Sequence, residues 1–319
     1  MTDYDMTILI VNYNTAHLLN EMFTTLYASL GTATKARVVV IDNASTDNSV
    51  EVLKTQYPEV MLIENQTNVG FGRANNQGLP HVEGRYVLLL NTDAFVAPDT
   101  LTKTLAYMDA HSQCGVLGVR LVGRDGKLQP SCRYFATAWS IFLLRTGLAR
   151  FFKNVRMVDD MTWDHASARE CDWVPGCYFL IRREAVDRVG LFDPRYFLYS
   201  EEVDLCHAVK NAGWQVVYFP DTTVVHIGGE SAKSLGKMSD VGQQIKPLQM
   251  ESEWLYFRKH HGLSGLMWHV VLTLLADLIV MGKLVVKTRR LQWIGSTLRQ
   301  LGLRLALLMR TRLGSVPTR

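Results

Sequence analysis

Residues 85–95 read RYVLLLNTDAF, a continuous apolar run that ends in Asn91, Thr92 and Asp93. An apolar run of this length, closed by polar turn residues, is typical of a buried strand. In an extended segment the side chains of Asn91 and Asp93 point to the same side. Because a carboxylate at a strand end can hold a hard divalent cation, and the cation a diphosphate, we predict an Mg²⁺ or Mn²⁺ site at Asp93.

The rest of the first half alternates apolar runs with amphipathic ones. The apolar runs predict strands, and the amphipathic runs predict helices that begin at polar capping residues. This alternation is typical of an α/β fold with a parallel sheet. The predicted strands are 6–11, 37–42, 59–64 and 86–91, and the predicted helices are about 16–30, one capped by Ser45 and Asp47, a short one within 68–79 and one opened by Pro98.

Polar residues follow three of these strands where each strand ends. They are Asn12, Asn14, Asp42, Asn43 and Asp93. Ligands of parallel α/β sheets bind beyond the carboxyl ends of the strands, so these residues predict a binding site. The alternative is that Asn and Asp only form turns and caps there. Several of them after three separate strands favour the binding site.

The second half of the chain is less regular. Its predicted elements are a hairpin, a helix or lid, and later strands and a helix. The final predicted strand ends near His226. In chain order, the elements are a hairpin around Asp125 and Gly126, a helix or lid over 136–152, no clear element over 153–168, a strand at 178–184, a helix over about 201–212 closed by Gly213, and strands at 214–219 and 222–227.

Two groups of late residues carry candidate chemistry. His226 is a candidate second metal ligand, and the alternative is a strand-end histidine with an ordinary hydrogen bond. Glu201, Glu202 and Asp204 open a helix, where acidic residues are also stabilising electrostatically. Because successive helical residues point about 100° apart, Glu201 and Glu202 are not expected to face one pocket together. Crowded carboxylates raise one another's pKa, which suits one of them to act as a general base.

Composition restricts the class of protein. The 319 residues are 48% hydrophobic and 20% charged, a balance typical of globular domains. The five cysteines form no CxxC pair, which argues against a zinc site or a disulfide framework and favours a reducing compartment. Neither a GxGxxG motif nor a P-loop motif is present, so enzymes of those two classes are not supported. The polar start of the chain predicts no signal peptide.

The C-terminal part is basic and apolar. No acidic residue follows Asp277, whereas nine Lys and Arg do, so the rest of the chain is net acidic. Residues 263–286 are long enough to span a bilayer, although His269 and Asp277 disfavour a simple span. Residues 291–313 repeat apolar groups and arginines at helical spacing, which predicts a helix lying on anionic lipid. The alternative is a pair of helices packed on the rest of the chain or on a second copy, as in a homo-oligomer. A nucleic-acid partner is disfavoured because the basic residues alternate with Leu rather than with stacking aromatics.

Five motifs in the same order resemble those of the family 2 glycosyltransferases, and more narrowly of their rhamnosyltransferase-like branch. The resemblance covers about residues 6–230. It implies a GT-A (nucleotide-diphospho-sugar transferase) fold, a largely parallel central sheet flanked by helices, here with a C-terminal helical extension. It also implies a nucleotide-sugar donor and an inverting transfer. The motifs are TILIVNYN, VVVIDNASTDNS, NVGFGRANNQG, YVLLLNTDAFV and LFDPRYFLYSEEVDLC.

The resemblance also implies roles for residues. Asp93 and His226 are expected to hold the metal, and Glu202, with Glu201 beside it, to supply the base. Among the nucleotide-binding residues, Asp42 is expected to bind the base of the nucleotide. Trp173 and Gly176 are predicted acceptor contacts, although Trp173 is equally a core candidate. The expected nucleotide-binding residues are Tyr13, Asn14, Asp42, Asn43, Asn68, Gly70, Arg73, Asn91 and Thr92.

The chain departs from the family pattern at three places. Asn91 stands where the first Asp of the family's DxD motif is expected, which makes metal binding more dependent on His226. Glu202 stands where the family has Asp, so the predicted base has a longer side chain. An arginine common after VDLC is absent, and Ala208 and Lys210 lie in that region instead.

The working hypothesis is an inverting glycosyltransferase on the cytoplasmic face of the inner or plasma membrane, peripheral or anchored by its C-terminal tail. It is expected to move L-rhamnose from dTDP-rhamnose to a lipid-linked or polysaccharide acceptor in cell-envelope glycan synthesis. The alternatives are a hexosyl or galactofuranosyl transferase that uses a UDP-sugar, and a nucleotide-sugar-binding protein without catalysis. The expected domains are a catalytic domain over 1–230 (donor half about 1–115, acceptor half about 116–230), a connecting segment over 231–262 and the tail over 263–319.

Overall fold

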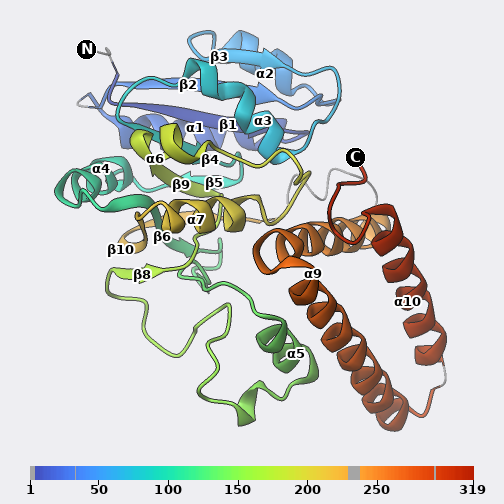
Figure 1. Cartoon of the computed structure of the whole chain (residues 1–319). Coiled ribbons are helices and arrows are strands. Elements are labelled where there is room, and N and C mark those ends of the chain that lie inside the picture. The colour runs from blue at the N-terminus through green and yellow to red at the C-terminus, as the bar shows by residue number, and fades with distance from the viewer. Residues whose placement is uncertain (1–3, 33, 229–237, 291) are drawn as a thin grey trace.

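One ten-stranded sheet organises the chain. The computed structural model describes residues 4–32, 34–228, 238–290 and 292–319. The strands follow the order β3-β2-β1-β4-β9-β6-β10-β5, with β7 added beside β6 and β8 beside β10. Figure 1 shows the strands of the first half at one end of the sheet and the C-terminal helices at the far side of the molecule.

The first half of the sheet is parallel, as the alternation of strands and helices predicts. It contains β1 (Met6–Asn12), β2 (Ala36–Asp42), β3 (Met61–Glu64) and β4 (Tyr86–Leu90). These strands pair in parallel, and Asn12 lies opposite Asp42 at their ends. The helices between them are α1 (Ala16–Leu30), α2 (Ser49–Gln56) and α3 (Phe71–Gly78).

The second half makes the sheet mixed, so the largely parallel arrangement is confined to the first half. Strand β9 (Tyr178–Arg182) is antiparallel to both β4 and β6 (Cys114–Val122). The predicted hairpin around Asp125 is confirmed, because β6 pairs with β7 antiparallel. The remaining elements are β5 (Ala94–Val96), α4 (Thr100–Ala110), β7 (Leu128–Gln129), α5 (Ala138–Thr146), β8 (Arg169–Cys171), α6 (Arg183–Val189) and α7 (Glu201–Asn211), with short 3-10 turns at Leu79–His81 and Ala149–Phe151.

Three local predictions were wrong. The two final predicted strands are one strand, β10 (Gln215–His226), whose pairing with β6 is irregular between Phe219 and Thr223. The irregularity accommodates Pro220, which lacks a backbone donor for a regular ladder. Residues 91–93 are a turn rather than extended, with Ala94 N donating to Asn91 O at 3.2 Å. Ser45 caps no helix; its Oγ accepts from the backbone of Asn14.

Helices cover both faces of the sheet, because the strands alternate their apolar side chains. In β1, Ile8 and Ile10 pack in the cluster that includes Leu19 of α1 and Leu101 of α4. Leu9 faces the opposite cluster, which contains residues of α3, α6 and α7. The loops beyond the carboxyl ends of the parallel strands are therefore left uncovered by these helices and available for a site.

Two long C-terminal helices pack on the sheet domain through α5. Helix α9 (Met238–Thr288) is broken at Gly262, where φ is 67°, and α10 (Gln292–Arg310) returns beside it (Figure 1). A third apolar cluster joins Phe142 of α5, Trp254 and Leu266 of α9 and Leu307 of α10. The expected connecting segment lies partly outside the described residues and is helical from Met238 onward. By length and apolar composition, Pro247–Thr288 is one helix able to cross a membrane.

Candidate active site

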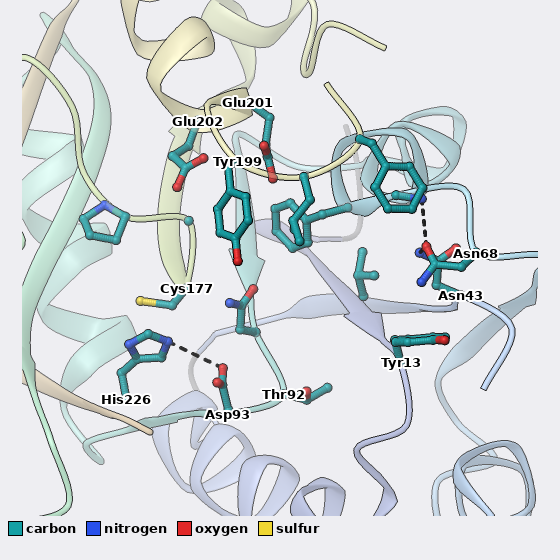
Figure 2. Close-up of a pocket in the computed structure, with 18 residues that line it drawn as sticks. Tyr13, Asn43, Asn68, Thr92, Asp93, Cys177, Tyr199, Glu201, Glu202 and His226 are labelled. Carbon is teal, nitrogen blue, oxygen red and sulfur yellow. Dashed lines mark hydrogen bonds and ion pairs between the residues drawn. The ribbon is translucent and has the colours of Figure 1, made fainter. Parts of the chain in front are cut away.

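A cavity of about 290 Å³ lies beyond the carboxyl ends of β1, β2 and β4. Figure 2 shows Asp93 and His226 on one wall, Glu201 and Glu202 on the opposite wall, and Tyr13 at the far end. Segments distant in the sequence therefore converge on one space. The cavity contains these predicted site residues: Tyr13, Asn43, Asn68, Gly70, Asn91, Thr92, Asp93, Gly176, Glu201, Glu202 and His226.

The far end of the cavity is built from asparagine amides. Asn43 Nδ2 donates to Asn68 Oδ1 at 2.9 Å, and Asn43 Oδ1 accepts from the backbone of Val69 at 3.0 Å. Asn68 Oδ1 also accepts from the backbone of Gly70. These bonds fix the loop before α3 against the end of β2. Two side chains placed far apart in the sequence thus form one rigid wall.

Gly70 is required at its position. Its φ is 92°, and a Cβ there would lie 2.4 Å from Phe197 O. The backbone of the next residue, Phe71, donates to the same carbonyl at 3.0 Å. Only glycine permits this approach, which brings the Phe197 loop over the cavity.

Asp93 and His226 form a pair whose chemistry fits a divalent cation. Gln129 Nε2 donates to His226 O at 2.8 Å, so Gln129 Oε1 faces His226 Nδ1, at 3.0 Å, and accepts its proton. The lone pair of Nε2 then faces Asp93 Oδ1, 3.6 Å away. Two acceptors at that separation make no hydrogen bond to each other, whereas a cation can bind both. Burial lowers the pKa of His226, which keeps Nε2 unprotonated at neutral pH.

This pair alone does not make a closed protein cage. Within the described residues, no group of three or more His, Cys, Asp or Glu side chains is placed to hold a metal ion. A cation at Asp93 and His226 needs further oxygen ligands. An incomplete protein site of this kind suits a cation that also binds substrate phosphates.

Glu201 and Glu202 both line the cavity, so the expectation that they cannot face one pocket together was wrong. They open α7 after Tyr199 and Ser200, whose φ angles of 73° and 69° redirect the chain at the helix start. Figure 2 shows Tyr199 between the two carboxyl groups. This turn sets the direction in which α7 starts, at the wall from which both carboxyl groups reach the cavity.

The two carboxyl groups differ in their surroundings. Glu201 is 3% exposed, and its Oε2 has no hydrogen-bond partner within the described part of the chain. Burial, followed by the charge of Glu202, raises the pKa of Glu201 well above its usual value. Burial also raises the pKa of Glu202, but the charge of Arg133 and a hydrogen bond from the backbone of Gly176 oppose that rise. The charge of Arg133 and the hydrogen bond from Gly176 thus favour the ionised form of Glu202, and Glu201 has no such contacts among the residues that the structure describes.

The model of Glycosyl transferase family 2 matches residues 7–190. The chain belongs to glycosyltransferase family 2. The N-acetylglucosaminyl-diphospho-decaprenol L-rhamnosyltransferase of Mycobacterium tuberculosis is 30% identical over 244 residues, covering 71% of this chain and 76% of that protein. The rhamnosyltransferase WbbL of Escherichia coli is 24% identical over 172 residues, covering 52% of this chain and 63% of that protein. The resemblance to the rhamnosyltransferase-like branch is confirmed.

A solved structure with a similar fold belongs to a mannosyltransferase. The mannosyltransferase PcManGT of Pyrobaculum calidifontis, in complex with GDP-Man and Mn²⁺, matches with a TM-score of 0.56 and 16% identity. The match covers 97% of this chain and 87% of that one. The expected GT-A fold is therefore confirmed for this family 2 glycosyltransferase.

Four predicted site residues lie away from the cavity lining of this glycosyltransferase. Asp42 is buried beneath it, bound to Asn12 Nδ2 at 2.7 Å and to the backbone of Ser45. Asn14 accepts from the backbone of Thr46. Arg73 donates to Pro194 O and to a carbonyl at the C-terminus. Trp173 is 8% exposed and packs in the core, with Nε1 bonded to Tyr134 O, so its core alternative is favoured.

Sequence patterns missed seven lining residues. None of them has a charged side chain, and most lie in loops whose course depends on tertiary contacts. Cys177 is the exception in chemistry, because its thiol lies near both Asp93 and Glu202, and burial raises its pKa. Cys177 follows the predicted Gly176, and Phe71 and residues 197–199 lie inside two of the motifs quoted above, so these were the available signals. The seven are Val11, Phe71, Pro175, Cys177, Phe197, Leu198 and Tyr199.

The C-terminal helices hold the wall formed by residues 197–204. Ser252 Oγ donates to Leu198 O at 2.8 Å, and the Arg319 guanidinium lies 5.3 Å from the centre of the Phe197 ring. Lys259 Nζ lies 2.7 Å from Asp204 Oδ2, one turn after Glu201. The C-terminal part is thus a structural support of the cavity as well as an extension.

Proposed function

We propose that this glycosyltransferase moves a sugar with inversion from a nucleotide diphosphate to a lipid-linked or polysaccharide acceptor in cell-envelope glycan synthesis. L-Rhamnose from dTDP-rhamnose is our first choice of donor, because both relatives compared above are named as rhamnosyltransferases. The observation that supports the proposal is the arrangement of Asp93 and His226 opposite Glu201 and Glu202 across one cavity. A UDP-sugar donor is the alternative.

Asp93 and His226 are the proposed ligands of Mg²⁺ or Mn²⁺. A cation bound there would neutralise charge on the departing diphosphate. Asp93 supplies the anionic ligand, and Gln129 keeps His226 in the tautomer that presents Nε2. Tyr13, Asn43 and Asn68, at the other end of the cavity, are proposed to contact the nucleoside.

Glu202 is the proposed general base, because the charge of Arg133 and the hydrogen bond from the backbone of Gly176 favour its ionised form. The acceptor hydroxyl oxygen forms a bond to the anomeric carbon while the bond from that carbon to the diphosphate breaks. Glu202 takes the hydroxyl proton, and the nucleoside diphosphate leaves with the bonding electrons. Attack from the face opposite the leaving group inverts the anomeric centre. Glu201, which stays protonated, is placed to donate a hydrogen bond into the cavity.

A thermal-shift panel of nucleotide sugars with Mn²⁺ or Mg²⁺, followed by a transfer assay, tests the proposal. A donor at 100 times its Kd should raise the free energy of unfolding by about 2.7 kcal/mol. We expect the largest shift with dTDP-rhamnose, and a smaller one without the cation. A chain that binds nucleotide sugars but never releases sugar or nucleoside diphosphate from any of them would be a binding protein instead.

Gln129 gives a prediction that tests the metal site without an activity assay. Replacing Gln129 by Leu removes the acceptor for His226 Nδ1, and we expect Mn²⁺ affinity to fall about 10- to 100-fold by calorimetry. Gln113→Leu is a matched control, because Gln113 is exposed and its side chain takes no part in the site. Equal Mn²⁺ affinity in both variants would show that Gln129 does not support His226 in metal binding.

The C-terminal helices are proposed to bring this catalytic domain to the cytoplasmic face of the inner or plasma membrane. The support is compositional: nine basic residues and no acidic residue follow Asp277, and one helix there is long and apolar enough to cross a membrane. Such a location suits an acceptor carried on a lipid. A nucleic-acid partner is not proposed.

A further inference from the structure

The second half of α9 turns its polar side chains toward the protein. Asp277, within the apolar run, pairs with Arg145 of α5 and with Arg304 of α10, whose Nε lies 3.1 Å from Asp277 Oδ2. Arg304 is 6% exposed and His269 is 1% exposed. Lys283, at the edge of this face, directs its Nζ to a backbone carbonyl of α5. The two residues that disfavoured a membrane segment are therefore not on the outer surface.

The outer face of the same segment is apolar. Apart from Ser264, Gly282 and Lys283, the exposed residues between Leu263 and Val286 are large and hydrophobic. At 100° per residue the central ones fall in a sector about 100° wide and extend for about 29 Å. They are Met267, Trp268, Val271, Leu275, Leu278 and Val286.

Helix α10 also exposes large apolar side chains. They are Ile294, Leu298, Leu303, Leu305 and Met309. Thr297, Gln300 and Arg304 of α10 line a cavity of about 520 Å³ that it forms with α9, whereas Leu307 and Leu308 are buried in the third apolar cluster. Large apolar side chains on the outer face are the reverse of what water selects for a surface helix pair.

Exposed apolar surface is concentrated on this helix pair. Of the 19 large hydrophobic side chains that are exposed in the described residues, 13 lie between Leu263 and Leu313. Exposed basic residues flank them, and no acidic residue does: Lys287, Arg289, Arg290, Arg299, Arg310 and Arg312. A second copy of the chain is a poor occupant, because a symmetric interface would bring the same basic residues together. An apolar face with a basic margin matches an anionic lipid surface.

We propose that the outer faces of α9 and α10 form a docking surface that lies flat in an anionic membrane leaflet without crossing it. Arg299 is exposed midway along α10, so a hairpin that crossed the bilayer would place this charge in the hydrocarbon. Beyond α10, the chain returns to the first half of α9, where Thr318 Oγ1 donates to Glu251 at 2.6 Å, and to the catalytic domain, where Arg73 Nη2 donates to Arg319 O at 2.9 Å. This inference rests on the proposed membrane location and specifies its geometry.

The test uses the full chain and vesicles of phosphatidylcholine with phosphatidylglycerol. Wild type should float with these vesicles, and Leu275→Glu/Leu278→Glu should lower partitioning by roughly a hundredfold. Met161→Glu, at an exposed hydrophobic position outside the helix pair, should leave it unchanged. Alkaline carbonate should release wild type from cell membranes. Donor turnover in detergent, measured on the same variants, separates failure of docking from failure of the proposed chemistry.

Three results would overturn the proposal. Equal flotation of wild type and the double variant would show that the protein contacts lipid through another surface. Resistance to carbonate would show that the helices cross the bilayer. A wild-type dimer in detergent-free buffer that the double substitution dissociates, without flotation of either, would make this face an interface between copies.

Discussion

Glu202→Gln should lower kcat of sugar transfer by about 10²- to 10⁴-fold, the usual contribution of a positioned general base. The amide keeps the shape of the side chain but accepts no proton, so donor binding should be nearly unchanged. Thermal shift with the donor and Mn²⁺ measures binding, and release of the nucleoside diphosphate measures turnover. A loss in kcat alone assigns Glu202 to the chemical step.

Glu201→Gln is the matched control on the adjacent residue. Since burial and the charge of Glu202 keep Glu201 protonated, an amide replaces one neutral hydrogen-bond donor by another, and kcat should fall less than about tenfold. A large loss in Glu201→Gln with little loss in Glu202→Gln would reverse the two roles.

The pH profile supplies a second readout of the same assignment. Burial raises the pKa of Glu202 above 4.5, and the base must be ionised to act. The wild-type rate should therefore rise with pH through an apparent pKa above 4.5 and lose activity as pH falls through it. This rise should persist in Glu201→Gln and disappear in Glu202→Gln. A rise that persists in Glu202→Gln would indicate another base.

The parallel half of the fold was predictable because its signals are local. Each strand there is a short apolar run that is closed by polar residues, such as Asn12 or Asp42. These polar residues lie at the edge of the sheet where the strands end. The second half depends on antiparallel pairing of β9 between β4 and β6, and no local pattern specifies which strands become neighbours. The continuity of β10 across Pro220 was missed for the same reason.

The site residues divide in a similar way. Asp93 and His226 were predictable as residue types at strand ends, but the orientation of the His226 ring depends on Gln129, which lies 97 residues before it. Helical spacing wrongly separated Glu201 from Glu202, because an angle of about 100° between neighbouring side chains still lets both reach a cavity beside the start of the helix. Trp173 could not be assigned to core or cavity until Tyr134 O was found to accept its indole proton.

The C-terminal helices show why a pattern of apolar residues cannot specify a surface. The sequence contains an apolar run with one acid in it, and that acid counts against a membrane only if it faces lipid. Arg145 and Arg304, from two other helices, place Asp277 inside. Deleting the tail would also remove the helices that pack beside Ser252 and the contact of Arg319 with Phe197. Point substitutions therefore test the membrane role of the tail more cleanly than truncation does.

Asp93→Ala should abolish measurable Mn²⁺ binding and lower kcat/KM by about a thousandfold, the equivalent of about 4 kcal/mol. Asp93 is the only anionic member of the pair, and the neutral imidazole of His226 holds a hard cation weakly without it. Calorimetry with Mn²⁺ and a transfer assay measure the two effects separately. Asp187→Ala is the control, because Asp187 pairs with Arg183 on the exposed side of α6 and should change neither quantity.

The comparison with His226→Ala tests whether His226 compensates for Asn91, which stands where the family has the first Asp of its DxD motif. If His226 takes the place of the missing carboxylate, removing it should reduce Mn²⁺ affinity about 10- to 100-fold, less than the loss in Asp93→Ala but well above the control. Asn91→Asp should then raise Mn²⁺ affinity in the His226→Ala background, because it restores an oxygen ligand on the same turn. Unchanged Mn²⁺ affinity in Asp93→Ala would show that a cation binds elsewhere, and the Asp93 wall would lose its proposed role in holding the diphosphate.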